Sequence, residues 1–159
     1  TVLRVRYGDV FLCAGGAEMA RPLSASVDGE ALLAAPPEHV QIFAEGVWRG
    51  ASEMQRNALE GVSATCVLTA VALSKLSRVY SDNRTVALVQ ATAAASISTW
   101  RPGAPTFDRL LLPLAHYALR GILWSHGVED LMNNSISRYG EELADVVESV
   151  NSPQLNSLG

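Results

Sequence analysis

Four arginines are the residues of this sequence best suited to bind an anionic ligand. They flank the segment 85–100 and are Arg78, Arg84, Arg101 and Arg109. The planar guanidinium group donates paired hydrogen bonds to phosphate oxygens, and such contacts position a protein on a nucleic-acid backbone. The segment 49–120 that contains them has a positive net charge, although the whole chain carries −4. We therefore predict these four arginines as a local nucleic-acid-binding surface.

Clusters with an obvious catalytic or metal-binding spacing are absent from the sequence. The histidines His39, His116 and His126 lie in separate segments, and there is no HExxH or CxxC pattern. The segment most like a polar cluster is His126-Gly-Val-Glu129-Asp130. This pattern is also expected where a histidine at the end of a helix lies beside an acidic face exposed to solvent. The nucleophile motif GxSxG and the phosphate-binding loops are also missing. These patterns predict no catalytic residue, no metal and no cofactor, and a protein that is not an enzyme.

The two cysteines, Cys13 and Cys66, form neither a CxxC pair nor a disulfide framework. Cys66 lies in an apolar run, which favours a reduced thiol that fills the core, and hence a reducing cytoplasmic environment over a secreted one. The first residues alternate apolar and basic side chains, which is not typical of a signal peptide. The longest apolar runs fall short of the roughly 20 residues that span a membrane. We expect no membrane span.

Most of the chain has apolar residues at helical spacing, and the expected helices lie in five segments. They are residues 38–48, 52–80, 85–100, 106–125 with a kink at Pro113, and 136–150, with a short turn at 128–132. The alternating run from Val2 to Leu12, followed by glycines and prolines, predicts a short strand in an extended arm. This strand needs a partner in its own chain or in a neighbouring molecule.

These elements predict an all-α fold: a bundle of about five helices with an extended N-terminal arm that can form a strand. The expected divisions are an arm at residues 1–37, a helical bundle domain at 38–150 and a flexible tail at 151–159.

A few residues resemble those of a known family of assembly proteins. Arg78 and the pair Phe107-Asp108 are similar to the separated Arg and Phe-Asp elements of the coat proteins of flexible filamentous plant viruses. The resemblance covers these residues only, since the aromatic surroundings of the family's Phe-Asp element are absent. It implies that Arg78 and Asp108 form a structural ion pair.

Composition favours a protein that buries surface against a partner. Only 18% of the residues are charged, against about 25% in typical soluble domains. We expect a non-enzymatic structural subunit that self-associates through its arm into a larger assembly, helical or filamentous and coat-like, with contact to nucleic-acid phosphates through the arginines. The alternative is a small helical regulatory or ligand-binding domain that acts as a dimer, with its tryptophans lining a pocket or filling the core.

Overall fold

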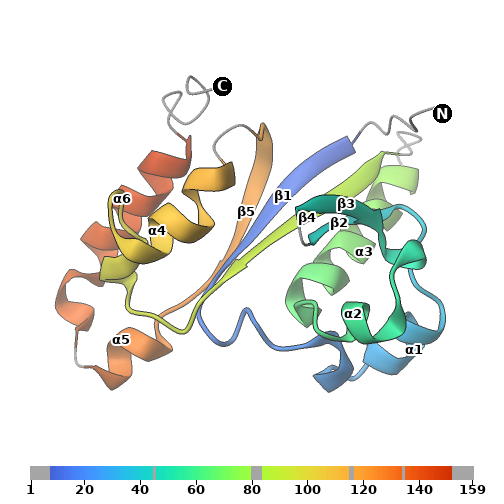
Figure 1. The fold of residues 1–159 in the computed structure, drawn as a ribbon, viewed down its shortest axis with the longest axis horizontal. Coiled ribbons are helices and arrows are strands. Elements are labelled where there is room, and N and C mark those ends of the chain that lie inside the picture. Colours follow the sequence, from blue (N-terminus) through green and yellow to red (C-terminus); the bar gives the residue numbers. More distant parts are fainter. Residues whose placement is uncertain (1–7, 45, 80–83, 115–116, 134, 152–159) are drawn as a thin grey trace. The chain divides into compact units, whose positions relative to one another are not determined.

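The computed structural model describes most of the chain. The described residues are 8–44, 46–79, 84–114, 117–133 and 135–151. They form a mixed α/β structure around one five-stranded sheet, in the order β3-β2-β4-β1-β5 (Figure 1). The strands are β1 (Gly8–Gly15), β2 (Val40–Ala44), β3 (Val47–Gly50), β4 (Thr85–Thr92) and β5 (Leu119–Ser125). The predicted all-α bundle is therefore wrong.

Six α-helices lie among the described residues, with short 3-10 turns between several of them. The helices are α1 (Gly29–Ala34), α2 (Arg56–Glu60), α3 (Ala64–Val79), α4 (Pro105–Leu110), α5 (Val128–Met132) and α6 (Tyr139–Asn151). The helix predicted at 136–150 is confirmed as α6 over most of its length. The helix predicted at 52–80 is divided, since α2 comes first and the long helix α3 begins only at Ala64. None of the helices in the described ranges is long and apolar enough to cross a membrane.

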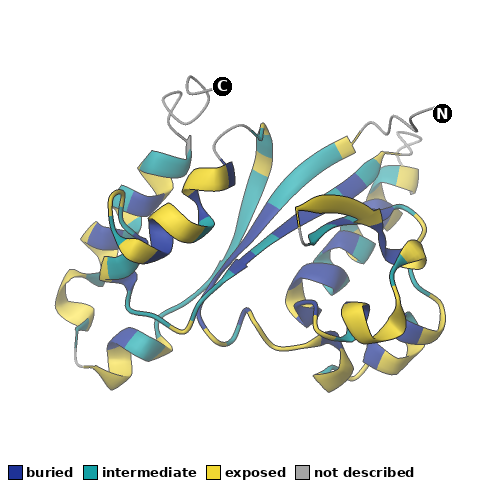
Figure 2. Cartoon of the chain, viewed as in Figure 1, coloured by how far each residue is buried: buried dark blue, intermediate teal, exposed yellow. Residues whose placement is uncertain are grey.

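Two compact units divide the chain. Unit 1 comprises Thr1–Cys13, Arg21–Gln90 and Leu119–Leu123, and unit 2 comprises Ala14–Ala20, Ala91–Ala118 and Trp124–Gly159. In unit 1, α3 packs against β2, and the core contains Val40, Ile42 and Leu88. In unit 2, the 3-10 turn Ile97–Trp100 (η3) contacts both α4 and α6 around the buried Trp100. Figure 2 shows buried residues in β4 and α3.

Residues 40–48, predicted as a helix, form the antiparallel pair of β2 and β3. Val40 and Ile42 are buried while their neighbour Gln41 is partly exposed, so the strand period of two decides the conformation. Phe43 is paired with Trp48 across the ladder, and their ring centroids are 5.2 Å apart. The apolar stripe that resembles a helix is thus a cross-strand aromatic pair.

The predicted helix at 85–100 is β4 followed by η3. β4 runs parallel to β2, with Val86 opposite Val40 and Leu88 opposite Ile42. Central parallel strands often contain continuous apolar runs, and the run Val86 to Val89 hides the strand period in the sequence, although burial alternates over much of β4. The helix predicted at 106–125 ends early, because a 3-10 turn contains Pro113 and the chain then enters β5.

The predicted N-terminal strand is β1, and it pairs within its own chain. In the sheet order it lies between β4 and β5 of its own chain. A disulfide joins Cys13 at the end of β1 to Cys66 in α3, so the expectation of a reduced core thiol at Cys66 is wrong. The predicted flexible tail lies outside the described residues beyond Asn151, and the predicted division at 1–37, 38–150 and 151–159 stays a prediction.

Candidate functional site

The carboxyl ends of three strands meet in unit 2. Just past β1, the Gly16 N–H donates to the carbonyl of Ser125 at the end of β5, at 2.8 Å. Just past β4, the Ala93 N–H donates to the Gly15 carbonyl at 3.0 Å. In α/β proteins, ligands bind outside the carboxyl ends of the strands, where the loops carry the functional groups. This edge is therefore the candidate functional site.

Two glycines shape the turn that follows β1. Gly15 has a φ of 142°, which disfavours any residue with a side chain, and a Cβ there would collide with the Ser125 carbonyl. A Cβ on Gly16 would lie 2.5 Å and 2.6 Å from the two carboxylate oxygens of Glu129. The missing side chains thus let the turn approach both β5 and α5.

Glu129, in the first turn of α5, points its carboxylate at this turn. Its Oε1 accepts a hydrogen bond from the Ala17 N–H at 2.8 Å. Its Oε2 is buried, lies 3.9 Å from His126 Nε2, and has no hydrogen-bond partner in the part of the chain that the structure describes. The Glu129 carboxylate is therefore held at the site by one backbone donor.

Asp130, the next residue, is fully buried and holds the loops around the site together. It accepts hydrogen bonds from Ser96 Oγ at 2.5 Å, from the Ile97 N–H at 3.0 Å and from Ser135 Oγ at 2.9 Å. Burial alone would raise the pKa of Asp130, but these three donors, with a smaller contribution from the nearby His126, outweigh it and lower the pKa below its ordinary value. Asp130 is therefore ionised at neutral pH.

His126 lies in the interior of unit 2, and its side chain has no exposed surface. Its Nε2 is 2.7 Å from the Ala95 carbonyl, an acceptor, so Nε2 carries the proton; Nδ1 faces Asp130 Oδ2 at 3.5 Å. The imidazole stacks on Tyr139 at 5.8 Å, and the Tyr139 hydroxyl donates to the His126 carbonyl. These contacts make His126 a packing group of the site.

The acidic residues after His126 are not the solvated face that the sequence suggests. Asp130 has no exposed surface, and the Glu129 side chain is only 12% exposed. Sequence reasoning picked out this cluster but missed its role, since its partners Ala17 and Ser96 are distant along the chain.

A nucleophile paired with a histidine is not seen among the described residues. The partners of His126 among those residues are the Ala95 carbonyl and the carboxylates of Glu129 and Asp130, and none is a serine, threonine or cysteine side chain. The turn after β1 carries Gly16 and Ala17, whose side chains have no nucleophilic atom. In the same ranges, no group of three His, Cys, Asp or Glu residues is placed to hold a metal ion.

The four predicted arginines are divided between the two units, with Arg78 and Arg84 in unit 1 and Arg101 and Arg109 in unit 2. Arg78 lies in the last turn of α3, and Arg84 pairs with Asp9 at 3.5 Å. Arg109 lies in the last turn of α4. Arg78 and Asp108 belong to different units, so their ion pair stays a prediction, as does nucleic-acid binding by the arginines.

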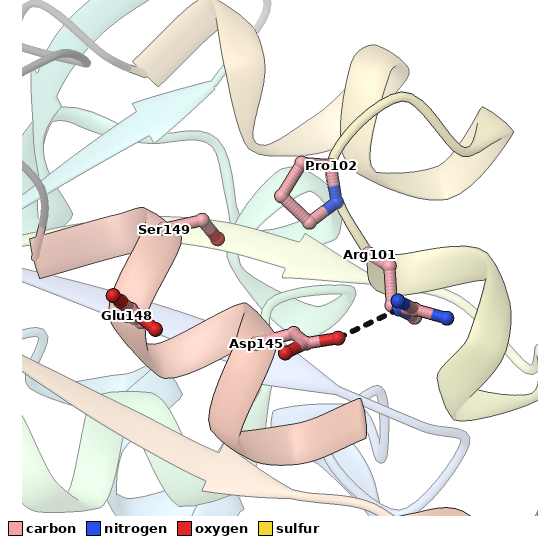
Figure 3. Close-up of a pocket in the computed structure, with 5 residues that line it drawn as sticks. All are labelled: Arg101, Pro102, Asp145, Glu148 and Ser149. Atoms are coloured by element: carbon pink, nitrogen blue, oxygen red, sulfur yellow. Dashed lines mark ion pairs between the residues drawn. The ribbon is translucent and has the colours of Figure 1, made fainter. Parts of the chain in front are cut away.

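Arg101 lies in a shallow pocket of about 350 Å³ between α6 and the loop after η3 (Figure 3). Its Nε donates to Asp145 Oδ2 at 2.9 Å, and its Nη1 is 4.0 Å from Glu142 Oε1. Pro102, Glu148 and Ser149 complete the lining. The charge of Arg101 is thus compensated by carboxylates of α6, which weakens its attraction for phosphate.

Two solved structures have the same fold as this chain. A carbohydrate acetylesterase from Xanthomonas citri is 19% identical with a TM-score of 0.75; the match covers 94% of this chain and 38% of that one. A protein from Arabidopsis thaliana is 15% identical with a TM-score of 0.70, and the match covers 96% of this chain and 71% of that one. The chain thus spans well under half the length of the Xanthomonas enzyme.

Comparison with curated proteins gave no match. The sequence does match a family model, described as "Carbohydrate esterase, sialic acid-specific acetylesterase", over residues 7–157. This match overturns both predicted functions, the non-enzymatic structural subunit and the helical regulatory domain, because the family consists of enzymes. The chain belongs to the family of sialic acid-specific acetylesterases, which are carbohydrate esterases.

Proposed function

We propose that the protein hydrolyses acetyl esters on the hydroxyl groups of sugars, with O-acetylated sialic acid as the substrate. The observation that carries this proposal is the family match over residues 7–157, which includes every strand and helix described above. The fold shared with the Xanthomonas acetylesterase supports it.

The reaction consumes one water for each ester. The water oxygen forms a bond to the acetyl carbonyl carbon, the bond from that carbon to the sugar oxygen breaks, and the products are acetate, the sugar hydroxyl and a proton. Negative charge develops on the carbonyl oxygen in the transition state, and backbone N–H groups commonly stabilise it. We infer that the Ala17 N–H, just past the carboxyl end of β1, is one such donor, because it already donates to a carboxylate oxygen.

Acetate release from O-acetylated sialic acid, followed by proton NMR, tests the proposal directly. We expect the O-acetyl signal to be replaced by that of free acetate, while the N-acetyl amide signal of the same sugar stays constant. Acetylated xylose is the comparison substrate that tests preference for sialic acid. No release above buffer from either sugar, with protein shown to be folded by circular dichroism, would overturn the proposed activity.

A variant at the turn links the activity to this edge of the sheet. In Gly15→Val, the Cβ meets the Ser125 carbonyl and the residue must adopt a φ that valine disfavours. We expect acetate release to fall steeply in this variant. Gly140→Val, where a Cβ meets nothing within 4 Å, is the matched control and should retain the activity. Equal rates in the two variants would place the reaction elsewhere.

A further inference from the structure

We propose that the turn Gly16-Ala17 is the binding site for the carboxyl group of acetate, and that the side chain of Glu129 occupies this site until substrate displaces it. The inference rests on the proposed function, because acetate is the product of that reaction. Glu129 is then a competitor, within the protein itself, that binds the turn in place of the acyl group of the substrate.

The first observation is the chemical group that the turn already binds. The Ala17 N–H donates to a carboxylate oxygen of Glu129 at 2.8 Å, across 112 residues of sequence. A carboxylate is the functional group of acetate, and its oxygens resemble the charged oxygen of an ester undergoing attack. The turn is therefore built to receive such an oxygen, and in this structure the protein supplies it.

The second observation is the fit of the carboxylate against Gly16. A Cβ on Gly16 would lie 2.5 Å from Oε2, 2.6 Å from Oε1 and 2.9 Å from the carboxyl carbon of Glu129. The whole planar group therefore packs against the backbone of Gly16, where any other residue would push it away. A glycine at this position and an N–H donor at the next residue together make a site for one carboxyl group.

The third observation is that few groups around Glu129 balance its negative charge. In the described ranges, no Arg or Lys lies within ion-pair distance of Glu129, and its buried Oε2 has no hydrogen-bond partner. The nearest ring nitrogen, His126 Nε2, is 3.9 Å away and donates to the Ala95 carbonyl. Burying a carboxylate on one hydrogen bond costs free energy, which reduces the preference of Glu129 for this conformation over a solvated one.

The helix that carries Glu129 is short and mostly exposed. It belongs to a five-residue helix, α5, whose Val128, Leu131 and Met132 are exposed. Only Asp130 of this helix is fully buried, and it keeps its own three hydrogen bonds when Glu129 rotates. In this proposal, rotation of the Glu129 side chain frees the Ala17 N–H without breaking the hydrogen bonds of Asp130.

Acetate binding to variants of Glu129 tests the inference. The probe is sodium acetate, titrated into nitrogen-15-labelled protein while the amide signal of Ala17 is followed. In Glu129→Ala the competitor is gone, and we expect affinity for acetate to rise by at least about tenfold over wild type, the size expected for losing a charged hydrogen-bond competitor. Glu129→Gln, which keeps the shape without the charge, should lie between the two.

The matched control is Glu141→Ala, which removes the same charge from an exposed side chain of α6 and should bind acetate as wild type does. An Ala17 signal that does not move in Glu129→Ala, with a normal spectrum elsewhere, would overturn the inference. So would equal acetate affinity in wild type and in both Glu129 variants.

Acetate release from O-acetylated sialic acid, measured on the same proteins, separates this inference from the proposed function. We expect Glu129→Ala to lower KM about tenfold, in step with its acetate affinity. Acetate binding in Glu129→Ala without hydrolysis by any variant would contradict the proposed function and leave the site standing. Hydrolysis with the same KM in wild type and Glu129→Ala, and no shift of Ala17, would contradict the site and leave the function standing.

Discussion

Ser96 donates a 2.5 Å hydrogen bond to Asp130 and so ties the loop after β4 to helix α5, across 34 residues of sequence. The Ile97 N–H adds a second bond to the same carboxylate. Asp130 itself makes no contact with the turn after β1 among the hydrogen bonds described. Its neighbour Glu129 does reach that turn, from the helix that Asp130 holds in place. The buried carboxylate is therefore a support for the site.

Replacing Asp130 by Asn should cost the protein about 3 kcal/mol of unfolding free energy, because a buried carboxylate that accepts charge-assisted hydrogen bonds becomes a neutral amide whose NH2 faces donors. Chemical denaturation of the two proteins measures the difference. Asp145→Asn, at a side chain 47% exposed in an ion pair with Arg101, is the control and should cost under about 1 kcal/mol. Equal losses in the two variants would contradict this role of Asp130.

The lowered pKa of Asp130 predicts the pH dependence of stability. Its folded-state pKa lies below the ordinary value of 3.8, so the unfolded chain binds this proton at higher pH than the folded chain does. The contribution of Asp130 is therefore complete above the ordinary pKa and is lost as pH falls through the folded-state pKa. Denaturation curves of wild type and Asp130→Asn should converge as the pH drops below about 4. A gap that stays constant from neutral pH to pH 3 would refute the shift.

The sequence predicts a helix most accurately where the helix has one polar face. The repeat of Tyr139, Leu143 and Val146 predicts α6 because its opposite face carries glutamates. β4 lacks any such contrast. Its alanines favour a helix by intrinsic propensity, but pairing with β2 outweighs that preference, and a short apolar run does not reveal which outcome wins.

The candidate site was visible in part. The sequence separates out His126, Glu129 and Asp130 as its one polar cluster, but their burial depends on partners that no local spacing shows. Ala17 is the clearest case, because an alanine has no functional side chain and its contribution is a backbone N–H. The two glycines before Ala17 indicate a loop in the sequence. The close approach of Gly16 to Glu129 follows only from the folded chain.

The disulfide between Cys13 and Cys66 should stabilise the protein by about 4 kcal/mol, because it closes a loop of 53 residues in the unfolded chain. Denaturation with and without a reductant measures this contribution. The double variant Cys13→Ala with Cys66→Ala is the control, since the reductant should leave its stability unchanged. A thiol reagent should label neither cysteine of the denatured, unreduced wild type. Two labelled thiols there would show that the bond is absent.

Trp100 offers a test of the aromatic packing next to the site. It is fully buried, and its ring meets Trp124 edge to face at a centroid distance of 5.2 Å. Trp100→Ala should cost about 3 to 5 kcal/mol, the usual loss for deleting a buried aromatic side chain.

The milder variant Trp100→Phe keeps an aromatic ring in the same space, and Trp100 Nε1 has no hydrogen-bond partner among the described residues. No hydrogen bond is therefore lost, and we expect a cost of about 1.5 kcal/mol or less from the change in volume alone. Thermal denaturation followed by fluorescence of the remaining tryptophans measures both variants. If Trp100→Phe proved as damaging as Trp100→Ala, the indole N–H would have to contribute a bond that the described contacts do not contain.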